Sequence, residues 1–272
     1  MNLMNQMNQM IRLMTFNIRN QNQIDGHNSW DLRRDKVASM IFLHKPDLAG
    51  FQEVLHEQLI YLDECLSDTY GWVGVGRDDG KEKGEYSPVF YRKDLFTVIS
   101  HDTKWLSETP DVCGSIGWDA KCVRLVTHVL FQQRSSGKLF HFFNTHFDHM
   151  GMIAQRNSAM MIKRKAADYG TENPVIVMGD FNCMESDEAY QILTQPENGR
   201  IILEDAMKVS IRKHHGPTGT FHEFGQLENL DKIDYIFTND RVKVLQHGIL
   251  ADHWDGAYPS DHMPVIADIL LV

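Results

Sequence analysis

The chain has 272 residues, and its 42% hydrophobic and 24% charged residues are typical of a folded globular protein. Its formal net charge of −10 argues against a broad basic face for duplex nucleic acid. The four cysteines form no Cys-x-x-Cys pair, and no apolar run reaches the roughly 18 residues of a membrane helix. Zinc-finger, redox-motif and membrane-spanning classes therefore have no support.

Residues 1–10 are polar and repetitive, without the basic flank and apolar centre of a secretory signal. We expect them to be a disordered or frayed leader, and we expect residues 11–272 to form a single domain. The same observation predicts a cytoplasmic location by default, or a secreted or periplasmic one if a signal peptide has been removed. No segment predicts an oligomer interface, so we expect a monomer.

Short apolar runs rich in β-branched and aromatic residues predict strands along the chain. They cover residues 11–16, 89–91, 96–100, 123–131, 139–144, 175–178, 232–237, 242–247 and 265–270. Helical spacing of apolar residues predicts one helix ending before Pro46, one at 55–66 and one at 154–165. Gly- and Asp-rich stretches predict long loops at 74–84 and 109–118. The pattern predicts an α/β protein with two packed sheets and helices outside.

Polar residues stand repeatedly at the ends of these apolar runs, where loops of layered α/β proteins gather around ligands. Asp234 is the most informative because it interrupts an apolar strand, where an unpaired carboxylate would be costly. His262 can supply its partner. The other residues of this kind are Asn17, Glu53, His146, Asp180, Asn182 and Asp261.

The segments that carry these residues resemble, in order, the motifs of the endonuclease/exonuclease/phosphatase superfamily. They are the strand ending in Asn17, Gln52-Glu53, Thr145-His146, Gly179-Asp180-Phe181-Asn182, Ile233-Asp234-Tyr235-Ile236 and Ser260-Asp261-His262. The superfamily includes DNase I, inositol polyphosphate phosphatases, neutral sphingomyelinases and the nocturnin-type deadenylases. Four further segments look like a mostly uncharacterised bacterial branch near the nocturnin-type enzymes: Arg33-Arg34-Asp35, Trp105-Leu106-Ser107, Gly117-Trp118-Asp119-Ala120 and residues 216–221.

This resemblance implies a DNase I-like fold, which is a four-layered α/β/β/α sandwich of two mixed sheets. It also implies metal-dependent hydrolysis of phosphate esters, as a phosphodiesterase, nuclease or phosphatase, with Mg²⁺ as the cofactor and Mn²⁺ as a substitute. Phosphate esters are anionic, so the attacking water needs activation and the phosphoryl group needs relief of charge.

The resemblance implies that Glu53, with Asn17 nearby, holds the metal ion. Asp261 would join them or bind a second ion. Magnesium is a hard cation that prefers such oxygen ligands and keeps several waters. The bound ion would withdraw charge from a phosphoryl oxygen and stabilise the leaving oxygen.

The resemblance also implies the catalytic roles. Asp234 would hold the ring of His262 in one tautomer, as in a catalytic triad. Either His262 or Asp180 would take the proton from the attacking water, and the sequence leaves this open. Asn182 and His146 would donate hydrogen bonds to the phosphoryl oxygens.

Glu85 matches a family carboxylate that orients the histidine corresponding to His146, although it would also fit a charge on a loop surface. Three arginines, Arg19, Arg33 and Arg124, would bind a terminal phosphate through their planar guanidinium groups, or form structural ion pairs. Both interpretations remain open for each of these arginines.

Asp148 and His149 directly follow the Thr-His motif and are candidates for substrate contact. Trp30 and Trp118 would stack on a base or sugar, or bury themselves in the fold. The sequence predicts no duplex-DNA face, so we expect a small molecule or single-stranded nucleic acid as the phosphate-ester substrate.

Two rival interpretations remain. Residues 144–149 nearly spell the His-x-His-x-Asp-His zinc motif of metallo-β-lactamase-like hydrolases, but Asn144 replaces the first histidine ligand. The second rival is a non-catalytic module that binds phosphate ligands on the same fold. Such a module would be expected to lose Glu53 or the Asp234–His262 pair first, and all three residues are present.

Overall fold

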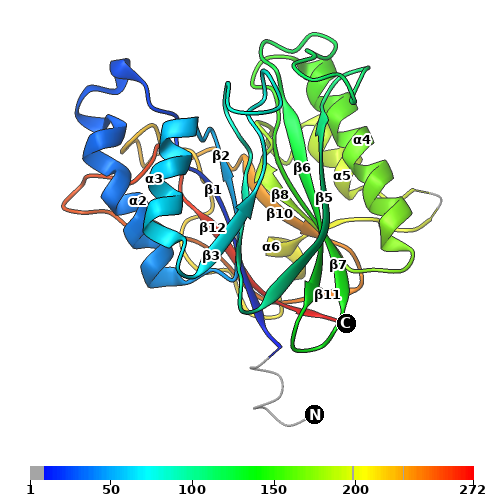
Figure 1. Ribbon diagram of the computed structural model, residues 1–272. Coiled ribbons are helices and arrows are strands. Elements are labelled where there is room, and N and C mark those ends of the chain that lie inside the picture. Colours follow the sequence, from blue (N-terminus) through cyan, green and yellow to red (C-terminus); the bar gives the residue numbers. More distant parts are fainter. Residues whose placement is uncertain (1–8, 198, 229) are drawn as a thin grey trace.

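The computed structural model of the protein describes residues 9–197, 199–228 and 230–272 (Figure 1). Of the leader expected at residues 1–10, residues 1–8 lie outside the described residues. The first strand, β1 (Ile11–Asn17), begins where the apolar pattern begins. No helix in the described ranges combines the length and apolar character that crossing a bilayer requires.

The strands form two mixed sheets of six strands each. In sheet 1 the spatial order is β11 (Val242–Ile249), β12 (Val265–Leu271), β1, β2 (Leu48–Gln52), β4 (Val89–Arg92) and β3 (Tyr70–Val73). In sheet 2 it is β5 (Phe96–Trp105), β6 (Leu125–Gln133), β7 (Leu139–His146), β8 (Val175–Asp180), β10 (Asp234–Thr238) and β9 (Glu204–Asp205). The pairs β1–β2 and β7–β8 are parallel, and their neighbours pair antiparallel.

Helices cover the outer face of each sheet, which gives four layers (Figure 1). Sheet 1 carries α2 (Trp30–His44) and α3 (His56–Leu66), and sheet 2 carries α4 (Met152–Gly170) and α5 (Glu188–Thr194). The short helices η1 (Gln23–Asn28) and α6 (Ala206–Val209) lie in connections. The predicted α/β class and sandwich of two mixed sheets are confirmed.

Three hydrophobic cores separate the four layers. Leu13, Met178 and Ile236 belong to the middle core between the sheets, whereas Phe16 and Val177 face the two outer cores. Successive side chains of a strand point to opposite faces, so every strand presents one row of side chains to the other sheet. The burial of these rows drives the two sheets together.

At one end of the strands β8 and β10 of sheet 2, these inward-facing rows change from apolar to polar side chains. Asp180 lies two residues beyond Met178 on β8, and Asp234 lies two residues before Ile236 on β10, so both carboxylates point between the sheets. The strand register places Asp234 opposite Asp180 and His146 opposite Asp180. Three chemically active groups therefore stand side by side in one row.

A buried amide pair joins the two sheets next to this row. Gln52 Nε2 of β2 donates to Asn144 Oδ1 of β7 at 2.6 Å, and Asn144 Nδ2 donates to the carbonyls of Phe51 and Pro88. Gly50 makes this approach feasible, because a Cβ there would lie 2.6 Å from Asn144 Oδ1. Asn144 is therefore a structural bridge, which gives the metallo-β-lactamase interpretation no support.

Most predicted elements are present with shifted ends. The helix predicted before Pro46 begins at Trp30, the strand predicted at 123–131 begins only at Leu125, and the segments 74–84 and 109–118 contain no helix or strand. The sequence did not predict β2, β3, β9, η1, α5 or α6. Each of them has seven residues or fewer, too few for an apolar period to be recognised.

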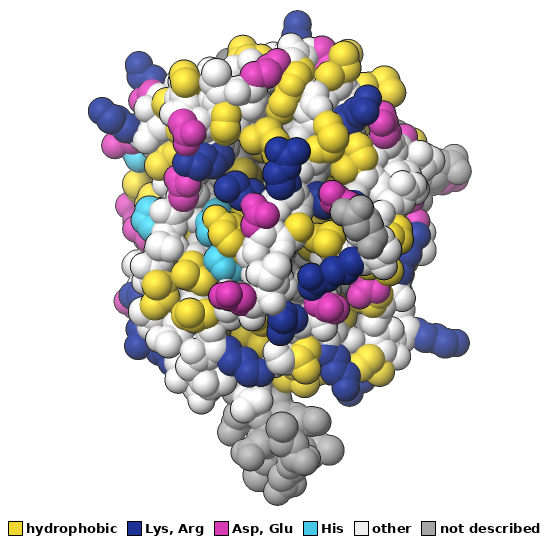
Figure 2. Space-filling model, turned by 90° about the vertical axis from the view of Figure 1, so that its right-hand side faces the viewer, with side chains coloured by type: hydrophobic (Ala, Val, Ile, Leu, Met, Phe, Trp, Pro, Cys, Tyr) yellow, Lys and Arg dark blue, Asp and Glu magenta, His cyan; other side chains and the backbone are white. Residues whose placement is uncertain are grey.

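The outer face over α4 and α5 carries acidic and basic side chains interspersed, without a continuous basic stripe (Figure 2). This distribution agrees with the formal net charge of −10. On this face the protein offers no electrostatic track for a nucleic acid backbone.

Candidate active site

A cavity of about 340 Å³ lies between the sheets, where β1, β2, β7 and β8 end and β10 begins. It gathers most of the residues predicted from the sequence, although they come from opposite ends of the chain. Its walls contain Arg19, Glu53, Glu85, Arg124, His146, His149, Asp180, Asn182, Asp261 and His262.

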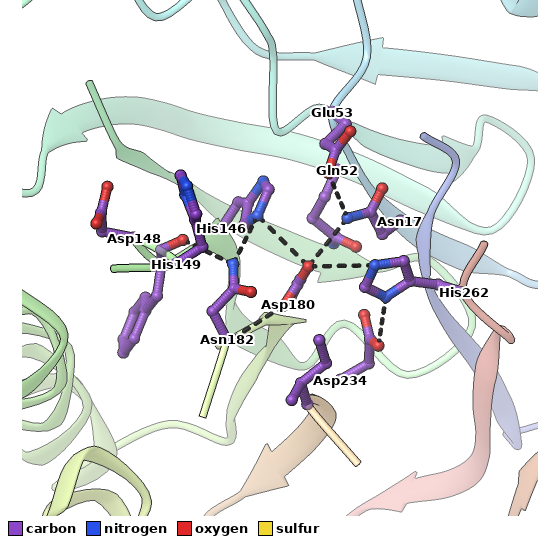
Figure 3. Close-up of polar contacts among 12 residues, drawn as sticks. Asn17, Gln52, Glu53, His146, Asp148, His149, Asp180, Asn182, Asp234 and His262 are labelled. Atoms are coloured by element: carbon purple, nitrogen blue, oxygen red, sulfur yellow. Dashed lines mark hydrogen bonds and ion pairs between the residues drawn. The ribbon is translucent and has the colours of Figure 1, made fainter. Parts of the chain in front are cut away.

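Asp180 is the centre of the polar network (Figure 3). Its Oδ2 accepts a hydrogen bond from Asn17 Nδ2 at 2.9 Å and lies 3.4 Å from His146 Nε2 and 3.8 Å from His262 Nε2. Its Oδ1 accepts from the backbone N–H of Asn182 at 2.9 Å. Burial, together with the nearby charge of Asp234, raises the pKa of Asp180 to about 7.

His262 is paired with the carboxylate behind it. Its Nδ1 lies 2.9 Å from Asp234 Oδ2, and Thr220 Oγ1 accepts the backbone N–H groups of Ile233 and Asp234. Burial alone would lower the pKa of His262, but Asp234 outweighs burial and raises it to about 10. Because Asp234 holds Nδ1, Nε2 is left to face the cavity, in the geometry of a catalytic His–Asp pair.

Glu53 lies at the start of the loop after β2, with a positive φ of 60° that is unusual outside glycine. Its Oε1 accepts from Asn17 Nδ2 and its Oε2 from the backbone N–H of Asn20, both at 3.0 Å. Burial would raise the pKa of Glu53, but these hydrogen bonds with the charges of His262 and Arg19 lower it. Glu53 is therefore held as an anion that points into the cavity.

Asn17 orients Glu53 and Asp180 through its Nδ2, while its Oδ1 accepts the backbone N–H of Arg19 at 2.9 Å. Ser260 Oγ donates to the carbonyl of Asn17 at 2.7 Å, which brings the segment carrying Asp261 to the end of β1. In this structure Asn17 acts as a positioning residue.

The donor set fits a hard divalent cation. Four carboxylates line the cavity, and burial raises the pKa of three of them, Glu85, Asp180 and Asp261. A raised carboxylate pKa indicates too little compensating positive charge, which a bound cation would supply. Oxygen ligands of this type suit Mg²⁺ or Mn²⁺, and Glu53 and Asp261 would hold the ion.

His146 and Asn182 form the next part of the wall (Figure 3). Asn182 Nδ2 lies 3.0 Å from His146 Nε2 and 3.1 Å from the carbonyl of Phe147, and Asn182 has a positive φ of 46°. Burial, with the charges of Arg124 and Arg77, holds the pKa of His146 well below its usual value. His146 is therefore neutral and not a fixed charge, and its Nε2 accepts a hydrogen bond from the Asn182 amide.

Glu85 does not form the predicted contact with His146. Its Oε1 accepts from Asn20 Nδ2 at 3.0 Å, its Oε2 accepts from Arg77 Nη1, and Arg124 Nη1 lies 3.8 Å from Oε2. The buried Nδ1 of His146 has no hydrogen-bond partner in the described part of the chain. Two arginines and an asparagine thus fix Glu85.

The three predicted arginines divide by their hydrogen-bond partners and by whether they line the cavity. Arg33 is 1% exposed and donates to the carbonyls of five residues, Ile18, Arg19, Asn20, Asn28 and Pro259, so the structure contradicts its predicted phosphate contact. Arg19 lines the cavity, paired with Asp25 and 3.7 Å from Asp261. Arg124 also lines the cavity, so these two remain candidates for substrate contact.

Asp148 is also not a substrate contact. It is 1% exposed, and its two oxygens accept four backbone N–H groups, from Lys121, Cys122, Met150 and Gly151. It organises the loop that presents His149, which is exposed and lines the cavity. Trp118 does not line the cavity, and Trp30 is buried in the outer core beside Arg33.

Sequence reasoning missed five cavity residues: Asn20, Arg77, Cys122, Phe221 and Ile233. Asn20 bridges Glu53 and Glu85, Arg77 lies in a loop of several charged residues, and the ring of Phe221 packs at 4.9 Å from the ring of His262. Phe221 and Ile233 carried a signal, since Phe221 ends the segment at 216–221 and Ile233 opens the Ile-Asp-Tyr-Ile motif. Asn20 and Arg77 have no local pattern that separates them from ordinary loop residues.

The protein is similar over nearly its whole length to several solved structures. A Bacteroides vulgatus structure described as an endonuclease/exonuclease/phosphatase is 43% identical, covers 97% of this chain and 99% of its own, and has a TM-score of 0.91. A Bacteroides thetaiotaomicron mannosyl-6-phosphatase is 33% identical over 96% of this chain and 100% of its own, with a TM-score of 0.86. The human nocturnin catalytic domain shares the fold at 19% identity over 97% of this chain and 94% of its own, with a TM-score of 0.76.

The sequence profile of the Endonuclease/Exonuclease/phosphatase family matches residues 14–262. That range begins in β1 and ends at His262, so it contains the whole polar network of the cavity: Asn17, Glu53, Asp180, Asp234 and His262. The chain therefore belongs to the Endonuclease/Exonuclease/phosphatase family.

Proposed function

We propose that residues 11–272 form one monomeric catalytic domain that hydrolyses phosphate esters with Mg²⁺ or Mn²⁺. The observation that carries this proposal is the arrangement around Asp180. A buried carboxylate with a pKa raised to about 7 lies within 3.8 Å of two histidine rings, and one of these rings is held by Asp234. Such an arrangement has no evident structural purpose, and it suits proton transfer at neutral pH.

In the proposed reaction Asp180 Oδ2 takes the proton from a water molecule, the water oxygen bonds to phosphorus, and the ester P–O bond breaks. The leaving alkoxide oxygen then takes a proton from solvent water, which gives the free alcohol. His262 keeps its own proton because Asp234 raises its pKa to about 10, so its Nε2–H stabilises charge on the phosphoryl oxygens. Asn182 and neutral His146 position the phosphoryl group. A cation held by Glu53 and Asp261 would neutralise part of the charge that develops on the phosphoryl oxygens.

A small ester fits this site better than a polymer. The cavity of about 340 Å³ is in the range of small-molecule sites, which is about 300–1,000 Å³. The acidic net charge gives no support to nucleic acid binding. The relative named a mannosyl-6-phosphatase, at 33% identity, also supports a small phosphomonoester.

The test is a hydrolysis screen of the chelator-treated protein with added Mg²⁺, Mn²⁺ or Zn²⁺, over sugar phosphates, nucleotides, an aryl phosphodiester and a phospholipid. We expect Mg²⁺ or Mn²⁺ to restore turnover, and Glu53→Gln to lower kcat/KM by about 100-fold or more. Glu57→Gln is the matched control, because Glu57 lies on the exposed face of α3 outside the cavity.

Three outcomes would contradict the proposal. They are turnover of no ester with any of the metals, strict dependence on Zn²⁺, and unchanged turnover in Glu53→Gln. The first outcome would identify the protein as a phosphate-binding module, and the third would move the metal to ligands other than Glu53.

A further inference from the structure

One end of the cavity carries a compact group of charged and polar residues that the proposed reaction does not use. We call it the Glu85 cluster, and it consists of Asn20, Arg77, Glu85 and Arg124. Both guanidinium groups converge on Glu85 Oε2, and Asn20 Nδ2 donates to Oε1. The side chain of Arg77 is 17% exposed, that of Glu85 14% and that of Arg124 7%. The three charged groups are therefore held by one another rather than by solvent.

The Glu85 cluster lies at the His149 end of the cavity, and Asn20 also links it to Glu53 through a 3.0 Å hydrogen bond from its backbone N–H. Arg124 Nη2 is 3.2 Å from His149 Nδ1, and in Figure 3 His149 and His262 stand on opposite sides of His146 and Asn182. A phosphoryl group bound near Asp180 would therefore place the remainder of a small substrate against the Glu85 cluster. Both ends belong to the same cavity of about 340 Å³.

The composition of the cluster selects a kind of ligand group. The cluster has a net positive charge, with both guanidinium groups already paired to Glu85. A second phosphate would have to compete with Glu85 for the arginines, an ammonium group would meet the net positive charge, and an apolar group would offer the polar atoms no hydrogen-bond partner. Arg77 Nε and Arg124 Nε are buried without a hydrogen-bond partner in the described part of the chain, and each lies within ion-pair distance of a carboxylate, at 3.8 Å from Asp78 Oδ1 and 3.7 Å from Asp148 Oδ2. A hydroxyl group both donates and accepts, so neighbouring hydroxyls can satisfy a carboxylate and a guanidinium at once.

The other cavity residues favour a sugar over a nucleoside. A base would need an exposed aromatic ring to stack on. The aromatic ring of the lining, Phe221, is already packed against His262 at 4.9 Å between ring centroids. Trp118, which could have provided a stacking face, does not line the cavity.

We propose that the Glu85 cluster binds the hydroxyl groups of a sugar, and that the natural substrates are phosphomonoesters of small sugars. This inference rests on the proposed hydrolytic function and deepens it. Arg77 and Arg124 donate to the sugar oxygens, Glu85 accepts from the sugar hydroxyls, and Asn20 keeps Glu85 in place.

The first experiment changes the substrate and leaves the protein intact. The wild-type protein with Mg²⁺ is compared on a hexose 6-phosphate, on cyclohexylmethyl phosphate, which has a ring of similar size without hydroxyls, and on a nucleoside 5′-monophosphate. We expect kcat/KM to be about 100-fold or more higher for the hexose phosphate than for the cyclohexyl ester. Equal values for these two esters, or a preference for the nucleotide, would overturn the proposal.

The second experiment changes the cluster. We expect Glu85→Gln to reduce kcat/KM for the hexose phosphate by about 10 to 100-fold more than for the cyclohexyl ester, because it removes a charged acceptor of hydroxyl protons. Glu82→Gln is the matched control, since Glu82 is exposed in the same loop and does not line the cavity. Equal losses on both esters would show that Glu85 serves the phosphoryl end or the fold, and would overturn the proposal.

A binding measurement separates this inference from the proposed hydrolysis. Calorimetric titration in the presence of a chelator compares a hexose 6-phosphate with inorganic phosphate, on the wild-type protein and on Glu85→Gln. We expect the sugar phosphate to bind the wild type about 10-fold more tightly than phosphate, and Glu85→Gln to lose this difference. Equal affinities in the wild type would overturn the sugar site, whereas the hydrolytic function fails only if no ester is turned over.

Discussion

At the scale of single residues, the hydrogen-bond partners of a buried side chain decide between roles that residue type leaves open. Arg33 and Arg124 are both arginines and both were candidates for phosphate binding. Arg33 donates its hydrogen bonds to backbone carbonyls, whereas Arg124 lines the cavity. The same holds for Asp148, whose oxygens are occupied by backbone N–H groups, and Asp234, whose Oδ2 faces a histidine. The number of backbone partners separates a structural charge from a reactive one.

Asp234→Asn tests the role of the histidine pair. The amide cannot stabilise an imidazolium and can favour the wrong tautomer, so we expect kcat to fall by about 10²–10⁴-fold with little change in KM. Steady-state kinetics with Mg²⁺ on the best ester would measure this. The variant should keep the circular dichroism spectrum of the wild type, and a kcat within threefold of the wild type would refute the assigned role.

Arg33→Lys tests the structural role of the buried guanidinium. A lysine cannot satisfy five carbonyls in several directions, so we expect the free energy of unfolding to fall by about 2–4 kcal/mol. Arg34→Lys, one position along α2 on its exposed face, should change it by less than about 0.5 kcal/mol. Urea denaturation measures both variants, and equal effects would show that the carbonyl contacts contribute nothing.

At the scale of elements, apolar periodicity predicted the long strands and helices well. It worked because rows of side chains that enter a core must repeat with the period of the element, as in β6, where Val129 and Phe131 alternate with half-buried neighbours. It failed for β3, whose four residues include Gly71, and for α5 and α6. Tertiary contacts define these short elements, and their own sequences carry no period.

The paired strands β6 and β7 contain an acid-sensitive element. His128 Nε2 lies 2.9 Å from His141 Nδ1, and Tyr169 of α4 stacks on His141 at 4.1 Å between ring centroids. Burial lowers the pKa of both histidines to about 4. The pair is therefore neutral in the folded protein, while in the unfolded chain each histidine titrates near its usual value of about 6.5.

The sign of the pH dependence follows from these values. Between about pH 6.5 and pH 4 the unfolded chain binds more protons than the folded protein, so stability is lost as the pH falls through this range. We expect the pair to contribute on the order of 2 kcal/mol to that loss. Urea denaturation at several pH values should show a shallower decline in His128→Gln, whose amide stays neutral. An equal slope in the variant would mean that other groups cause the acid sensitivity.

At the scale of the whole molecule, the site depends on contacts that no local pattern encodes. Periodicity placed Asn17, Asp180 and Asp234 at the ends of strands, but it could not show that these ends meet. Strand register across sheet 2 and the Gln52–Asn144 bridge between the sheets bring them together. Family resemblance supplied that long-range information, and it failed at Glu85, whose partners Arg77 and Asn20 lie outside the motifs.

The assembled site makes the stability of the molecule depend on the cation. The carboxylates gather only when the two sheets pack, so the folded protein should bind Mg²⁺ and the unfolded chain should not. Linkage then predicts about 2.7 kcal/mol of added stability when free Mg²⁺ is 100 times its dissociation constant, and a melting temperature that rises with concentration. Differential scanning calorimetry in chelator and in rising Mg²⁺ measures this. Glu53→Gln should abolish the rise and exposed Glu57→Gln should keep it. An undiminished rise in Glu53→Gln would place the ion elsewhere.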